Sequence, residues 1–160
     1  MKLGLAIEEL HRSENHLHRV LLAVSDRHKA DHEVFHVARD IARWSGRHVA
    51  ELARIGADYG VELDPEPRQE PGVLERVQQA ASDLFGRRPE PSLLLLADLR
   101  HVHREAAGVS LDWELLAQAA QGSRQRGLLE LAQRCHPDTL RQMRWANAKL
   151  KESATQALVS

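Results

Sequence analysis

The chain has 160 residues, of which 42% are hydrophobic, 4% are aromatic and 28% are charged, a mixture that favours helices over sheets. Its 22 Lys and Arg residues nearly balance its 23 Asp and Glu residues, and this net charge of −1 argues against nucleic acid or an anionic membrane as the principal partner. The single cysteine, Cys135, excludes an intramolecular disulfide and a cysteine-based metal cluster.

The first 60 residues predict two helices. Apolar residues recur at three- and four-residue steps from about Leu3 to Lys29, which is typical of an amphipathic helix. Asp31 is a suitable N-cap for a second helix, which we expect to run to about Tyr59 and to stop at Gly60. Because the connection between these helices is very short, they should form an antiparallel hairpin.

The segment from about 61 to 91 has a different composition. It contains five of the six prolines in the chain, which interrupt any long regular element. Between the prolines, residues from Val73 to Phe85 have a short amphipathic helical pattern. The sequence therefore predicts a long crossover that contains one short extra helix.

Two further helical regions follow the crossover. The third long helix is predicted from near Ser92 to about Gln121, and a fourth region from near Arg124 to about Leu158. Pro137 either kinks this fourth region or separates it into two helices, because proline lacks the amide donor and clashes with the preceding turn. Two antiparallel hairpins joined by a long crossover make an all-α four-helix bundle.

Ionisable side chains fall on the otherwise apolar seams of these predicted helices. Charged groups in an apolar core are costly unless they are paired or bound to a metal. The candidate metal ligands are Glu14, His48 and His103, with His18 or His136 assisting. A carboxylate with two or three imidazoles suits iron, zinc, manganese or copper by ligand type. These ionisable residues on otherwise apolar helix faces therefore predict a transition-metal site in the core of the bundle.

These side chains can share a site only if they lie at similar heights along the bundle. A helix rises about 1.5 Å per residue, so heights can be compared by counting from a shared end. If the crossover returns the chain to the end where it began, Ser92 lies level with Leu3, and His103 then lies level with Glu14. The alternatives to a metal site are buried Glu–His hydrogen bonds, histidines at a solvated rim, or another ligand.

The chain resembles the ferritin-like superfamily in its helix lengths, its long second-to-third connection and its inner-face His and Glu. This resemblance implies one bundle domain over residues 1–160, with iron or oxygen chemistry. Di-iron members carry a Glu on each of two helices and Glu-x-x-His on the other two. Glu14 matches the first-helix Glu, and Glu33 and His36 have the Glu-x-x-His spacing. No Glu-x-x-His occurs on the fourth helix, so a complete di-iron ligand set is not expected.

The sequence supports two functional hypotheses. The first is a ferritin-like bundle that binds iron, zinc or manganese in its core, and the alternative is a non-catalytic scaffold or dimeric interaction module with structural histidines. Nucleophile motifs, phosphate loops and dinucleotide fingerprints are missing, so the sequence leaves open whether the protein is an enzyme. The longest strongly apolar run, 93–97, is too short to span a membrane, and no signal peptide is evident. We therefore expect a cytoplasmic protein without a membrane or nucleic-acid partner, for which a homo-oligomer is compatible with the sequence.

Overall fold

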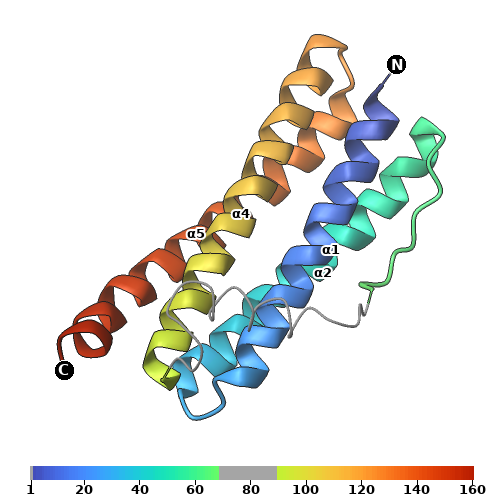
Figure 1. The fold of residues 1–160 in the computed structure, drawn as a ribbon. Coiled ribbons are helices and arrows are strands. Elements are labelled where there is room, and N and C mark those ends of the chain that lie inside the picture. Colours follow the sequence, from blue (N-terminus) through green and yellow to red (C-terminus); the bar gives the residue numbers. More distant parts are fainter. Residues whose placement is uncertain (1, 69–89) are drawn as a thin grey trace.

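The computed structural model describes residues 2–68 and 90–160, and these two ranges form four long helices, one 3-10 turn and no strand (Figure 1). The all-α class predicted from the sequence is confirmed. The short helix predicted between 73 and 85 lies outside the described residues. The elements in chain order are α1 (Leu3–Arg27), α2 (His32–Gly56), η1 (Ala57–Tyr59), α4 (Pro91–Gly122) and α5 (Arg126–Val159).

The ends of α2 are set by local signals in the sequence. Asp31 caps its first turn, because one carboxylate oxygen accepts a hydrogen bond from the Val34 amide at 3.1 Å. The α-helix ends at Gly56 and is followed by the single turn of η1. Gly60 then adopts a φ of +76°, a left-handed conformation that costs glycine little, so the chain leaves the helix there.

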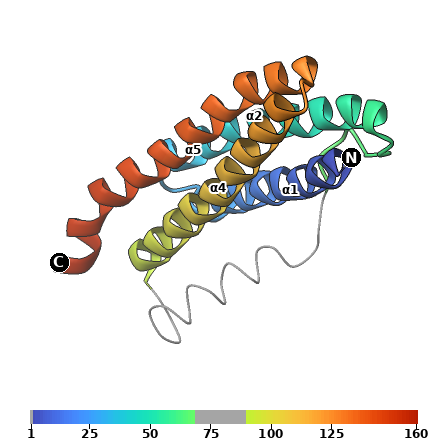
Figure 2. The same cartoon turned by 90° about the horizontal axis from the view of Figure 1, so that it is seen from above.

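Helices α1 and α4 lie side by side and run in opposite directions (Figures 1 and 2). The end of α1 meets the start of α4, where His28 Nε2 and Asp98 Oδ2 lie 2.6 Å apart. In the middle of α1, Ser13 Oγ donates a hydrogen bond to Asp112 Oδ2, further along α4, at 2.8 Å. The height comparison that placed the start of the third helix level with the first residues of the chain is therefore wrong.

The physical reason is the path of the crossover. Tyr59 and Val61 lie against Gly4, at the start of α1. The next residues run along α1, since the Asp64 carbonyl lies 2.8 Å from His11 Nε2 and the Arg68 amide donates to Asn15 Oδ1 at 2.9 Å. Residues 61–68 thus lead away from the end of the bundle where α1 begins, and α4 begins at the opposite end.

Helix α5 packs against α4 and α2. The amide of Gln142, which is fully buried, donates to the Ile41 carbonyl at 2.8 Å and to Ser45 Oγ at 2.9 Å. Pro137 lies inside a continuous helix, so it does not separate two helices. None of the described helices combines the length and apolarity that crossing a bilayer requires.

We expect Gly4→Ala to destabilise the protein by about 1–3 kcal/mol, because the added Cβ would lie 2.9 Å from the Tyr59 carbonyl oxygen. Gly108→Ala, in open space within α4, is the matched control and should stabilise by about 0.5–1 kcal/mol through helix propensity. Urea denaturation of the two variants measures both effects. Equal changes in the free energy of unfolding for the two variants would contradict the close approach of η1 to α1.

Candidate functional site

The structure brings two of the five predicted metal ligands together, Glu14 and His48. Both are buried, and His48 Nδ1 lies 3.0 Å from Glu14 Oε1. Trp113 Nε1 donates to the same Glu14 oxygen at 2.9 Å. On the other side of the imidazole, His48 Nε2 lies 3.1 Å from Asp138 Oδ2. The other oxygen of Asp138 accepts a hydrogen bond from Arg141 at 2.9 Å, which links this core network to the surface.

The charge on His48 follows from these contacts. Burial by itself would lower the pKa of His48, but the Glu14 carboxylate, with a contribution from Cys135, raises that pKa to about 11. At neutral pH both ring nitrogens therefore carry protons, and each donates to a different carboxylate. An imidazolium with both nitrogens protonated has no lone pair for a metal ion. This geometry favours a buried ion pair at His48.

The three other predicted ligands lie in three separate places. His18 packs near α2, where a Cβ added to Gly46 would lie 3.6 Å from its ring, and burial is the main cause that lowers the pKa of His18. His103 is half-buried in the groove between α4 and α5. His136 Nε2 lies 2.8 Å from Ser110 Oγ. The five side chains therefore do not converge on one point.

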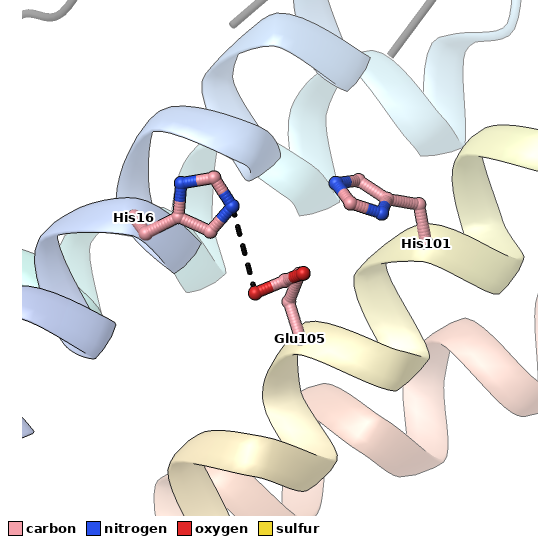
Figure 3. Close-up of side chains that lie close together, drawn as sticks. All are labelled: His16, His101 and Glu105. Atoms are coloured by element: carbon pink, nitrogen blue, oxygen red, sulfur yellow. Dashed lines mark ion pairs between the residues drawn. The ribbon is translucent and has the colours of Figure 1, made fainter. Parts of the chain in front are cut away.

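A different cluster lies between α1 and α4, formed by His16, His101 and Glu105 (Figure 3). Each side chain offers one ligand atom, and these three atoms lie within 4.8 Å of one another. His16 Nε2 is 3.5 Å from Glu105 Oε2. The centroids of the His16 and His101 rings are 6.3 Å apart, and the rings are arranged edge to face. Within residues 2–68 and 90–160, this is the one group of at least three His, Cys, Asp or Glu side chains close enough to hold a metal ion.

The electrostatics of this cluster differ from those of the buried network. Burial is the main cause that lowers the pKa of His101, and the neighbouring His16 acts in the same direction against the attraction of Glu105. A lowered pKa favours the neutral imidazole, whose unprotonated nitrogen can bind a cation. The Glu105 side chain is 34% exposed, so the cluster is also open to solvent. The cluster therefore presents two imidazoles and one carboxylate close together at a position that solvent reaches.

No family model, curated protein or solved structure matches this chain.

Sequence reasoning missed His16 and did not connect His101 with Glu105. The last two residues are four positions apart on one helix, so they share a face, and this spacing was visible in the sequence. The residue of α1 that faces them depends on the direction of α4. Asp138, the second carboxylate at His48, was also missed, because no local pattern connects residues 90 positions apart.

Proposed function

We propose that this protein is a helical bundle that binds a divalent transition-metal ion through His16, His101 and Glu105. The observation that carries the proposal is the approach of three ligand atoms, from two helices, to within 4.8 Å of one another. Two imidazoles and one carboxylate suit Zn²⁺, Fe²⁺ and Mn²⁺ by ligand type. Three protein ligands would leave a coordination position for water or a substrate, as in catalytic rather than structural sites.

Binding would require a small contraction of the cluster. Ligand atoms lie about 2.0–2.2 Å from a zinc ion, so any two of them are closer to each other than the 4.8 Å limit seen here. The partly exposed Glu105 side chain can supply this movement by changing rotamer. Because the cluster joins α1 to α4, a bound ion would also stabilise the contact between these helices.

Metal binding can be tested by elemental analysis and calorimetric titration of protein purified without an affinity tag. We expect one Zn²⁺, Fe²⁺ or Mn²⁺ ion per chain. His101→Ala and Glu105→Ala should each weaken binding by at least about tenfold, since even loss of a residue that only supports a ligand costs 10–100-fold. His103→Ala is the matched control, because His103 lies on the same helix but faces the α4–α5 groove.

Two results would count against this assignment. Folded protein that is indifferent to all three ions would exclude the site. Retention of the ion in His101→Ala, with its loss in Glu14→Ala and His48→Ala, would place the metal in the buried core as the sequence predicted.

We also propose the ferritin-like connection for the bundle, with two antiparallel hairpins joined by a long crossover. The antiparallel course of α1 and α4 and the path of residues 61–68 along α1 support this topology. The contact of Gln142 with Ile41 supports the packing of α5 on α2. This proposal concerns topology, and the iron or oxygen chemistry of that superfamily does not follow from it.

A second candidate function is a non-catalytic scaffold that associates with another copy of the chain. The observation that favours it is a pair of leucines, Leu111 and Leu115, which are 60% and 69% exposed one turn apart on α4. Trp44 and Trp145 do not contribute to such a surface, because both are partly buried against the core. A scaffold needs no metal, so the metal titration described above distinguishes the two candidates.

A further inference from the structure

A shallow groove lies between α4 and α5, which are joined by residues 123–125 and diverge toward the end of α5 (Figures 1 and 2). It consists of two adjoining hollows of about 140 and 280 Å³, which share His103 and Asn147. Each volume lies below the roughly 300–1,000 Å³ of sites that enclose a small molecule. None of the three residues of the proposed metal cluster lines the groove. The groove is therefore a separate surface feature, suited to a partner larger than a small molecule.

One end of this groove is basic. The charged residues among its described lining are Arg100, Arg104 and Arg144, and no Asp or Glu is among them. Within residues 2–68 and 90–160, none of these three guanidinium groups forms an ion pair. Arg100 and Arg104 are one turn apart on α4, and Arg144 comes from α5 on the other side of the groove. This end of the groove therefore carries uncompensated positive charge in a chain whose net charge is −1.

The same face of α4 becomes apolar further along the helix. Leu111 and Leu115 are seven and eleven positions after Arg104, so they continue its face of the helix. These two leucines are 60% and 69% exposed. Glu114, which precedes Leu115, lies 3.7 Å from His136 Nε2, within ion-pair distance when this histidine is protonated. The face formed by α4 and α5 thus has a basic part followed by an apolar part.

We propose that this face binds an acidic amphipathic helix of a partner protein. The apolar side chains of such a helix would pack against Leu111, Leu115 and Leu140, the last of which is 39% exposed at the groove. Its carboxylates would accept charge-assisted hydrogen bonds from the three arginines. From Arg100 to Leu115 the face spans about 22 Å at about 1.5 Å per residue, which is the length of a helix of about 16 residues.

A second copy of the chain matches this face less well than an acidic partner. In a two-fold contact, each patch meets the same patch on the other subunit. The arginines of one copy would then face arginines or leucines of the other, and none of the described residues lining the groove would offer them a carboxylate. Because like charges held together repel each other, a partner of opposite charge is favoured.

The test is a fluorescence-anisotropy titration with a labelled synthetic helix of about 16 residues, with leucines at three- and four-residue steps and glutamates on both sides of them. We expect this peptide to bind, and the same peptide with lysine at every glutamate position to bind at least about tenfold more weakly. Arg144→Gln should weaken binding of the acidic peptide about two- to fivefold, since one exposed ion pair is lost. Leu115→Ser should weaken it about tenfold, because the helix then covers less apolar surface.

Matched controls carry the same substitutions elsewhere on the surface. Lys29→Gln removes an exposed cation between α1 and α2, and Leu5→Ser removes a leucine of α1 that is 65% exposed. Both controls should leave peptide binding unchanged.

Four outcomes would overturn the proposal. The first is no binding of the acidic peptide at millimolar concentration, and the second is equal weakening by a groove variant and its control. The third is tighter binding to phosphatidylserine vesicles than to the peptide, which would make this face a membrane-binding surface. The fourth is self-association of the protein that Leu115→Ser abolishes, which would make a second copy the partner.

Discussion

Replacement of His48 by alanine should lower the free energy of unfolding by about 3–5 kcal/mol, the range found when one partner of a buried ion pair is removed. Glu14 is fully buried, and without His48 its carboxylate keeps, among residues 2–68 and 90–160, the hydrogen bond from Trp113 alone. Asp138 is less affected, because its side chain is 20% exposed and also pairs with Arg141. Urea denaturation at pH 7 measures the loss.

His36→Ala is the matched control, because His36 is exposed on the same helix and its removal should change stability by only about 0.5 kcal/mol. A Glu14→Gln/His48→Gln double variant should lose less stability than the sum of the two single variants, since removal of both charges leaves none unpaired. If His48→Ala cost no more than His36→Ala, the buried ion pair would not exist in solution.

The pairing of Glu14 with His48 shows where counting along the sequence works. These residues lie on helices joined by a very short connection, so their heights are fixed by counting from one turn. Local signals also fix the helix ends, such as the cap at Asp31 and the left-handed Gly60. Sequence reasoning therefore predicted the four helices and, from the buried network, the residues Glu14 and His48.

The same counting failed across the crossover. The height of His103 depended on the end of the bundle at which the third helix begins, and no local pattern in the crossover specifies that end. Because α4 runs opposite to α1, the residue of α4 that contacts Glu14 is Trp113, ten positions beyond His103. At about 1.5 Å per residue, this places His103 roughly 15 Å further along the bundle axis. The cluster at His16 was missed for the same reason.

The free energy of unfolding should fall as the pH rises from about 6.5 toward about 11. The native state holds the His48 proton up to a pKa of about 11, whereas an unfolded histidine releases it near pH 6.5. Within this window the native state binds one proton more than the unfolded state, so stability decreases with pH, by up to about 1.4 kcal/mol per pH unit. Urea denaturation at a series of pH values measures this slope.

His48→Gln is the comparison that isolates this effect, because glutamine keeps a polar side chain in the core but does not titrate. Its stability should depend less on pH above 6.5 than that of the unchanged protein. Below pH 6.5 both proteins should lose stability as the pH falls, since burial lowers the native pKa values of His18 and His101 and the unfolded state then binds more protons. The unchanged protein should therefore be most stable near pH 6.5–7. If the stability of the two proteins fell in parallel above pH 6.5, His48 would not be charged in the folded core.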